Sequence, residues 1–167
     1  MRLLLKLLKA LNSDASPWQL AFGLTFGMIV GLTPILRLHN LVILLLVLCF
    51  RVNISGFLLA LAFFSGVAWI TDPLVLGWGE SVLTAASLQD IWTALYNTDL
   101  GRISQFNHTL TMGSLLLGLL LSPIMLFVSR WLIVKYRERF MAWVTKLKII
   151  QFLKGSKLYQ LYQQLQE

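Results

Sequence analysis

The sequence predicts an all-α, polytopic helical membrane protein with short proline-interrupted helices, two or more full spans and amphipathic terminal helices. Hydrophobic residues make up 57% of its 167 residues and the mean hydropathy is +0.75. Charged residues make up only 13%, whereas soluble domains have about 25%. Several apolar runs reach or approach the roughly 17–25 residues with which a helix crosses a bilayer. We expect a single membrane domain over residues 1–167, with no soluble enzyme domain.

Residues 1–15 predict an uncleaved amphipathic helix rather than a secretory signal. Lys6 and Lys9 interrupt the leucines, and no Ala-x-Ala-like cleavage site follows closely. Leucines recur at helical spacing opposite the basic side chains, which suits a helix lying on an anionic membrane surface. Packing on the protein's own tail is the alternative.

The predicted membrane core, residues 16–134, begins with the sequence SPWQ. Ser16 followed by Pro17 and, three residues after Ser16, by Gln19 is the pattern of a capping box with proline at the first helical position. The helix that follows carries glycines four residues apart, at Gly23, Gly27 and Gly31. This spacing places them on one helical face, where another helix backbone can approach closely.

A structural turn is predicted at Pro34, because the residue before a proline disfavours the helical conformation. About 16 helical residues precede the turn, and about a dozen follow, from His39 or Asn40 to Phe50. The second piece would cover roughly 18 Å of a hydrocarbon layer about 30 Å thick. These lengths favour a re-entrant hairpin, and two ordinary tight spans are the alternative.

The predicted lipid-headgroup ligands are three residues that follow the turn, namely Arg37, His39 and Asn40. An arginine at bilayer depth requires water or an anionic partner, and the planar guanidinium group suits a phosphate. For His39 a structural role is the favoured alternative, with its side chain satisfying the carbonyl groups of the turn.

The segment from Ile54 to Ile70 is a predicted full span, because its 17 residues carry no charge. Gly56 and Gly66 offer small surfaces for packing against the glycines of the first helix. A turn is predicted at Asn53, before this span. Asp72 and Pro73 are a second predicted turn, in which Asp72 caps a further helix with Pro73 in its first turn.

Three further segments complete the predicted elements. Residues 74–105 predict an amphipathic helix lying at the membrane surface, followed by a turn. The run from Leu110 to Val128 predicts a second span, kinked at Pro123, with Ser122 satisfying backbone groups that the proline frees. Residues 135–167 predict a basic cytoplasmic amphipathic tail.

The charge distribution predicts the orientation. Three basic residues precede residue 18 and eight lie from residue 130 onward, whereas residues 71–105 contain four acidic residues and one arginine. By the positive-inside rule, both termini are cytoplasmic and the acidic segment lies outside. An odd number of crossings must then precede Thr71, which either a re-entrant hairpin plus one span or three spans would satisfy.

The sequence predicts no catalytic, metal or cofactor site. Cys49 is the only cysteine, so a disulfide or Cys-based metal site cannot form within one chain. His39, His108 and the acidic residues form no known nucleophile, metal or phosphate motif. Nucleic-acid binding is not expected, because the basic residues follow membrane topology and no recognition motif is present.

Residues 13–80 resemble the bacterial inner-membrane family catalogued as domain of unknown function 2062. The resemblance rests on SPWQLAFGLTFGMIVGLTPILRLHN, RVNISG and TDPL, although the family usually has Asn-Pro where this chain has Asp72-Pro73. It implies a small multi-pass protein of the cell envelope, sometimes joined to or near envelope glycosyltransferases. It implies no reaction and no established binding residues.

The expected function is that of a noncatalytic subunit of the bacterial inner membrane. We expect it to assist transport of lipid or lipid-linked envelope material, with membrane phospholipid and a larger envelope protein as partners. A homo-oligomer is also compatible with the sequence. The alternatives are a scaffold that anchors a partner's transmembrane helix through the glycine face, and a small oligomeric transporter or channel.

Overall fold

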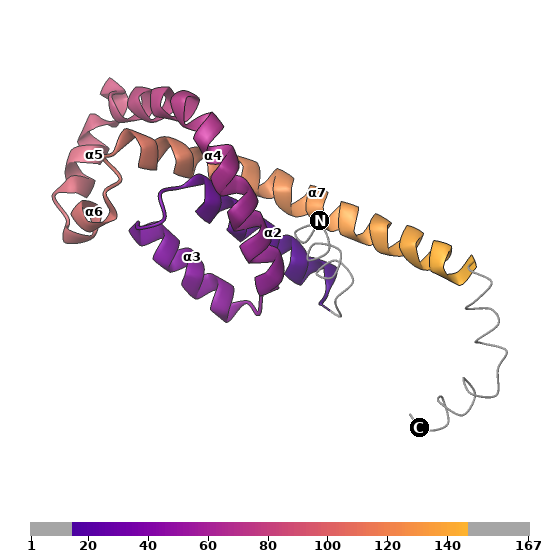
Figure 1. Cartoon of the computed structure of the whole chain (residues 1–167). Coiled ribbons are helices and arrows are strands. Elements are labelled where there is room, and N and C mark those ends of the chain that lie inside the picture. Colours follow the sequence, from indigo (N-terminus) through magenta and orange to yellow (C-terminus); the bar gives the residue numbers. More distant parts are fainter. Residues whose placement is uncertain (1–14, 147–167) are drawn as a thin grey trace. The chain divides into compact units, whose positions relative to one another are not determined.

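The computed structural model describes residues 15–146, with side chains described as far as residue 139. Every regular element in this range is helical (Figure 1). The elements are α2 (Pro17–Leu32), α3 (Leu38–Cys49), α4 (Ile54–Leu83), the 3-10 helix η1 (Ala86–Leu88), α5 (Gln89–Tyr96), α6 (Asp99–Ser104) and α7 (Thr109–Lys146). The all-helical prediction is confirmed for this range. The amphipathic helix predicted for residues 1–15 and most of the predicted tail lie outside the described residues.

The chain divides into two compact units, residues 1–130 and 131–167. The boundary predicted between membrane core and tail, after residue 134, falls close to this division. The first unit contains α2 to α6 and the beginning of α7, and it holds every group discussed below as a site.

Helix α2 begins and ends where the sequence predicts. Gln19 N donates to Ser16 Oγ at 3.2 Å, and Ser16 N donates to Gln19 Oε1 at 3.0 Å. These two bonds form the predicted capping box. The helix stops at Leu32 because Thr33, the residue before Pro34, is extended.

The core of the first unit forms around α2, which is apolar on all sides and mostly buried. A helix without a polar face is stable only where it is enclosed or surrounded by lipid. Neighbouring helices supply Ile43 and Val47 from α3, and Phe57 from α4. Side chains of α7, among them Leu115 and Leu121, pack against the same cluster. The central helix is therefore one of the two shorter apolar helices, α2 and α3, and not one of the two long helices.

Helix α4 continues through the turn predicted at Asp72 and Pro73, so that prediction is wrong. Both residues lie inside the 30-residue helix, which ends at Leu83. Pro73 cannot donate to the carbonyl four residues earlier, and an interior proline bends a helix; Figure 1 shows α4 changing direction partway along its length. The helix continues because Val75 and Gly79, beyond the proline, are buried and pack on the beginning of α7.

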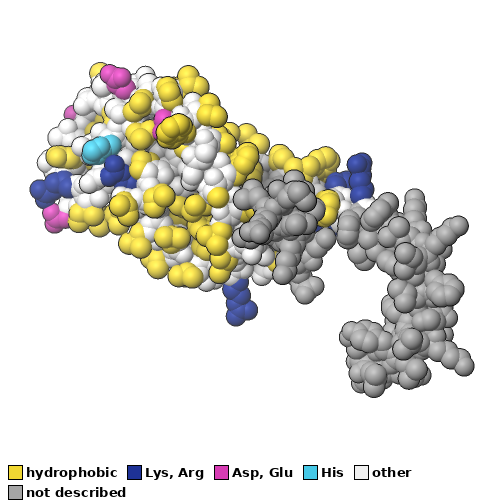
Figure 2. All heavy atoms as spheres, in the orientation of Figure 1, with side chains coloured by type: hydrophobic (Ala, Val, Ile, Leu, Met, Phe, Trp, Pro, Cys, Tyr) yellow, Lys and Arg dark blue, Asp and Glu magenta, His cyan; other side chains and the backbone are white. Residues whose placement is uncertain are grey.

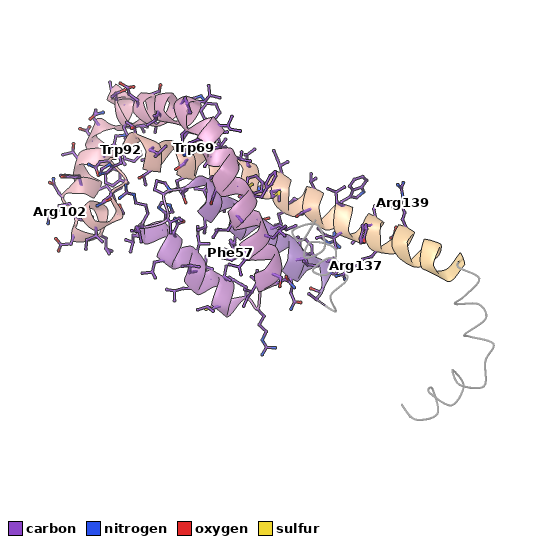
Figure 3. All side chains as sticks on the ribbon, viewed as in Figure 1. Phe57, Trp69, Trp92, Arg102, Arg137 and Arg139 are labelled. Atoms are coloured by element: carbon purple, nitrogen blue, oxygen red, sulfur yellow. The ribbon has the colours of Figure 1, made fainter. Side chains whose placement is uncertain are left out.

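The single surface helix predicted within residues 74–105 is also wrong. Residues 74–83 belong to α4, and the remainder forms η1, α5 and α6. A hydrogen bond joins the pieces across this division, because Trp92 Nε1 donates to Val82 O at the end of α4, at 3.1 Å. Thr98 then begins α6 by accepting a hydrogen bond from Gly101 N at 3.0 Å. Figure 3 shows the side chains of Trp92 and Arg102 on this segment.

Pro123 lies inside α7, as predicted. The carbonyl that loses its helical partner is that of Leu119, four residues earlier. Ser122 Oγ donates to Leu119 O at 2.8 Å, so the predicted compensation by this serine is confirmed. Such compensation is the way in which membrane helices tolerate proline.

Two helices are long and apolar enough to cross a membrane, Ile54–Leu83 and Thr109–Arg139. Only 17% and 28%, respectively, of their most apolar windows are buried inside the protein. A core helix of a soluble protein would be mostly buried. Large apolar side chains instead face outward, including Trp69, which is 88% exposed (Figure 3), and hydrophobic side chains cover much of the face in Figure 2.

Candidate functional site

The hairpin formed by α2 and α3 returns to its starting point. Asn53 N donates to Gln19 O at 3.2 Å, so the end of the hairpin lies beside the start of α2. Asn53 also caps α4, because its Oδ1 accepts a hydrogen bond from Gly56 N at 2.8 Å. The starts of α2 and α4 therefore lie at one end of the bundle, and the Pro34 turn points away from that end.

Cationic side chains mark this end of the bundle. The guanidinium carbon of Arg130, in α7, lies 4.3 Å from the ring centroid of Trp18, a cation–π contact. Arg51, in the connection from α3 to α4, is exposed and has a φ of 49°. The left-handed conformation is uncommon for a residue with a side chain. Helix α7 thus runs antiparallel to α2, since Ile29, which is later in α2 than Trp18, lies near Gly118, which is earlier in α7 than Arg130.

The three glycines of α2 face α4. A Cβ atom at Gly23 would lie 2.6 Å from Asn53 O, and one at Gly31 would lie 2.8 Å from Leu61 O. A Cβ atom at Gly27 would overlap Phe57 O. The backbones of the two helices therefore touch along three successive turns. The chain's own α4 occupies this face, so a partner's helix cannot also pack there.

The two glycines expected to complete this contact behave differently. A Cβ atom at Gly56 would lie 3.3 Å from Leu20 Cδ2, so Gly56 does face α2. An added Cβ at Gly66 would have no atom of the described residues within 4 Å, and the prediction that Gly66 packs against α2 is wrong. The reason is helical phase. Phe57, Leu61 and Phe64 lie on the side of α4 that faces α2, and Gly66 projects elsewhere.

A second glycine contact was not predicted. A Cβ atom at Gly79, in α4, would overlap Thr109 O, and one at Gly113, in α7, would overlap Val75 O. These glycines allow the second half of α4 to cross α7 in backbone contact. Neither belongs to a regular glycine series, so no spacing in the sequence identifies them as partners.

The side chain of Asn40 holds the Pro34 turn closed. Thr33 Oγ1 donates to Asn40 Oδ1 at 3.0 Å, and Asn40 Nδ2 donates to Pro34 O at 2.9 Å and to Ile35 O at 3.3 Å. Asn40 is only 2% exposed. Satisfying the carbonyls of the turn, which was the structural alternative for His39, is therefore the role of Asn40. Its amide is engaged within the turn and is not a free headgroup ligand.

Arg37 and His39 retain unused donor or acceptor capacity. Nε of Arg37 and Nε2 of His39 are buried and have no hydrogen-bond partner within the described part of the chain. Unsatisfied buried polar atoms are uncommon and call for an explanation. The guanidinium group of Arg37 also forms no ion pair with any described carboxylate.

The backbone position of Arg37 is also unusual for a cation. It is the N-cap residue of α3, in an extended conformation, and its side chain makes no capping bond. Capping positions favour Ser, Thr, Asp or Asn, and the positive end of a helix dipole disfavours a cation. The same end favours an anion, through its free N–H groups and its dipole. Arg37, His39 and the start of α3 together have the chemistry of an anion site.

An apolar surface continues from this anion site along α3. Its large exposed side chains are Leu41, Val42, Leu44, Leu45 and Leu48, which are between 42% and 72% exposed. Helix α6 contacts α3. A cationic group followed by an exposed apolar stripe matches the two parts of an anionic lipid.

No cluster of three or more His, Cys, Asp or Glu side chains suited to a metal ion occurs among the described residues. His108 lies at the start of α7, where its carbonyl accepts the helical hydrogen bond of Met112 N at 2.9 Å.

Comparison with known proteins identifies the family. No curated protein and no solved structure matches the chain. Residues 2–142 match the model of a family described as an uncharacterized protein conserved in bacteria, DUF2062. The match extends well beyond residues 13–80, on which the resemblance rested, and covers most of the 167 residues. The chain therefore belongs to the DUF2062 family.

Proposed function

We propose that this protein is a noncatalytic subunit of the bacterial inner membrane that assists the movement of phospholipid or lipid-linked envelope material. The observation that carries the proposal is the pair of buried nitrogen atoms, Arg37 Nε and His39 Nε2, that have no partner among the described residues and lie next to the exposed apolar side of α3. An anionic headgroup would satisfy the guanidinium group, and its acyl chains would lie along α3.

The depth of the Pro34 turn supports a re-entrant hairpin. The end of α2, at Gly31, packs beside Leu61 to Ser65 of α4, about 10 residues beyond the start of α4. At 1.5 Å per residue this is roughly 15 Å along that helix, against a hydrocarbon layer about 30 Å thick. A turn at that depth would place Arg37 inside the membrane. Irregular backbone is tolerated there only when protein or water covers it, and the Asn40 side chain bonds two carbonyls of the turn, those of Pro34 and Ile35.

Phosphate is the headgroup chemistry that fits best. A guanidinium group binds phosphate through paired, charge-assisted hydrogen bonds, and the N-terminus of α3 adds favourable N–H groups. The cost of keeping an arginine at depth, at least about 2.5 kcal/mol, would fall when the phosphate is bound. The site would thus hold an anionic lipid more strongly than a neutral one.

A larger envelope partner or further copies of the chain would complete the assembly. Exposed apolar side chains of α3, α4 and α7 provide surface for lipid or for such partners. A scaffold that uses the glycine face of α2 is disfavoured, because α4 already covers that face. The first unit contains only a few helices, so a closed conduction path would require an oligomer.

The proposed topology predicts labelling from opposite sides of the membrane. Cys49 is exposed and is replaced by serine, after which single cysteines are introduced at Gln89 or Gln160. An impermeant thiol reagent should label Gln89→Cys from the periplasm, because residues 71–105 are acidic. It should label Gln160→Cys only after the membrane is opened, because the basic end is retained inside. Periplasmic labelling at both positions would refute the orientation.

Arg37→Gln tests headgroup binding. We expect the variant to insert and fold normally but to copurify about tenfold less phosphatidylglycerol, because a charge-assisted contact contributes about 1.5 kcal/mol. Arg37→Lys should retain an intermediate amount, since it keeps the charge and loses the planar fork. Lipid bound per mole of purified protein is measured by mass spectrometry.

Arg51→Gln is the matched control, because Arg51 is the exposed arginine at the other end of the hairpin. Its lipid recovery should stay within about twofold of the unmodified protein. Equal recovery from the unmodified protein and Arg37→Gln would show that Arg37 is a structural or topological charge and would refute the proposed site.

A further inference from the structure

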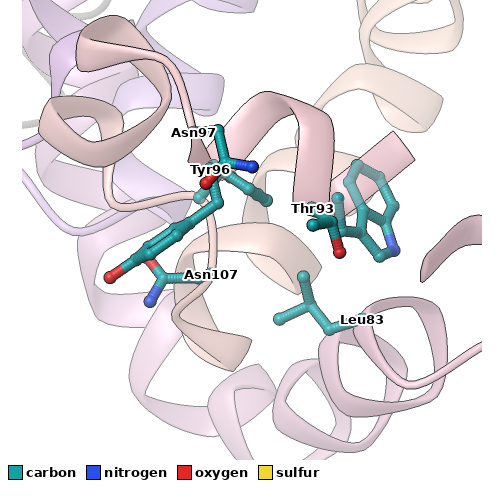
Figure 4. A pocket seen from close by; sticks show the side chains of 7 residues that line it. Leu83, Thr93, Tyr96, Asn97 and Asn107 are labelled. Carbon is teal, nitrogen blue, oxygen red and sulfur yellow. The ribbon is translucent and has the colours of Figure 1, made fainter. Parts of the chain in front are cut away.

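The segment between α4 and α7 contains an open pocket that the proposed lipid function does not use. Its volume is about 330 Å³, and Figure 4 shows its lining side chains. This volume lies at the lower end of the range typical of small-molecule sites, about 300–1,000 Å³. The lining comes from the end of α4, from α5 and from the connection between α6 and α7.

Aromatic rings form one part of the lining, and two of them are held in place. The Trp92 indole N–H donates to Val82 O, and its ring lies 5.8 Å from that of Phe106, between centroids. Tyr96 is 48% exposed at the pocket. Trp92 and Phe106 therefore form a preorganised part of the wall, and Tyr96 leaves part of its ring surface exposed to a ligand.

Neutral hydrogen-bonding groups form the other part of the lining, namely Thr93, Asn97 and Asn107. Each Asn amide offers donors and acceptors, and the Thr hydroxyl offers both. No charged side chain of the described residues lines the pocket. The nearby cation Arg102 is paired with Asp99 at 2.6 Å, and the whole segment from residue 71 to residue 105 is acidic. An anionic ligand is therefore disfavoured.

The geometry points to a binding site for a neutral saccharide. A sugar ring has an apolar C–H face that can stack on an aromatic ring and hydroxyl groups that can bond to amides and hydroxyls. The pocket offers both kinds of surface without charge. Tyr96 would stack on the sugar, and Asn97 and Asn107 would bind its hydroxyl groups. The inference does not depend on phosphate binding at Arg37.

The experiment uses the full-length protein in nanodiscs of phosphatidylethanolamine and phosphatidylglycerol, so that no sugar-headed detergent competes. Saturation-transfer NMR titrations use methyl β-glucoside and methyl N-acetyl-β-glucosaminide, with glucose 1-phosphate as the anionic comparison. At least one neutral glycoside should bind saturably and more tightly than the sugar phosphate. Absence of saturable transfer to both neutral glycosides, or tighter binding of glucose 1-phosphate, would overturn the inference.

Variants locate the binding site. Tyr96→Ala should weaken glycoside binding about fivefold, as expected for the loss of one aromatic contact. Tyr96→Phe retains the ring and should stay within about twofold. Ile91→Ala, on the same helix but outside the lining, is the matched control and should bind as the unmodified protein does. Unchanged binding in Tyr96→Ala together with Asn107→Ala would place the sugar elsewhere and refute the assignment, whatever the result for Arg37→Gln.

Discussion

Gly27→Leu is expected to disrupt the contact between α2 and α4 and to reduce strongly the yield of folded protein. A Cβ atom at Gly27 would overlap Phe57 O, and it would also lie 2.8 Å from Ala60 Cβ. The obstacle is backbone inside a helix, which cannot move aside as the end of a flexible side chain can. Overpacking typically costs about 1–3 kcal/mol, and we expect about 3 kcal/mol or more here. Thermal unfolding and monodisperse yield in detergent are the measurements.

Gly66→Leu is the matched control for this prediction. It introduces the same side chain at a helical glycine with no atom within 4 Å of an added Cβ. It should leave the unfolding temperature and the yield close to those of the unmodified protein. If Gly27→Leu and Gly66→Leu behaved alike, close backbone contact between α2 and α4 would not be what stabilises the unit.

Asn40→Ala has the second largest expected effect. The substitution removes both donor bonds of Nδ2, leaves Pro34 O without its partner, and opens a void at a side chain that is only 2% exposed. A buried carbonyl left without a partner costs about 1–3 kcal/mol, and we expect a loss near 2 kcal/mol in the free energy of unfolding. The Pro34 turn should also become accessible to protease in nanodiscs.

Asn97→Ala provides the comparison, because Asn97 is exposed and its side chain forms no hydrogen bond within the described structure. Its stability should change by less than about 0.5 kcal/mol. Full stability of Asn40→Ala would mean that other groups close the turn. In that case, the loss of bound lipid expected for Arg37→Gln would depend on Arg37 itself and not on the bonds by which Asn40 holds the turn.

Local backbone chemistry was predictable from the sequence. The capping box at Ser16, the end of α2 before Pro34, the turn at Asn53 and the compensation of Pro123 by Ser122 each depend on residues within four positions of one another. The helical class and the two long apolar helices depend on composition and run length, which the sequence also contains. The face of α2 that approaches another helix followed from the i, i+4 spacing of its glycines.

Contacts distant in sequence were decided only by the tertiary structure. Asp72 and Pro73 have the residues of a helix start, yet Val75 and Gly79 pack on α7 and extend α4 past them. Whether a proline bends or ends a helix depends on such packing, because neighbours can offset the lost hydrogen bond. The packing of Gly66 could likewise not be predicted from the sequence. Small size permits close approach, but helical phase and the position of the neighbouring helix decide whether it occurs.

The sequence by itself determined that this chain is helical and apolar, where its first helix starts and stops, and which residues near Pro34 are polar. Only the tertiary structure divided the roles among those residues. Asn40 turns inward and bonds the carbonyls of the turn, whereas the Nε of Arg37 and the Nε2 of His39 have no partner in the part of the chain that the structure describes. The physical reason is geometric: the Asn40 side chain reaches Pro34 O and Ile35 O, whereas Arg37 Nε and His39 Nε2 reach no partner among the described residues. Their spacing alone could not show which residue would do so.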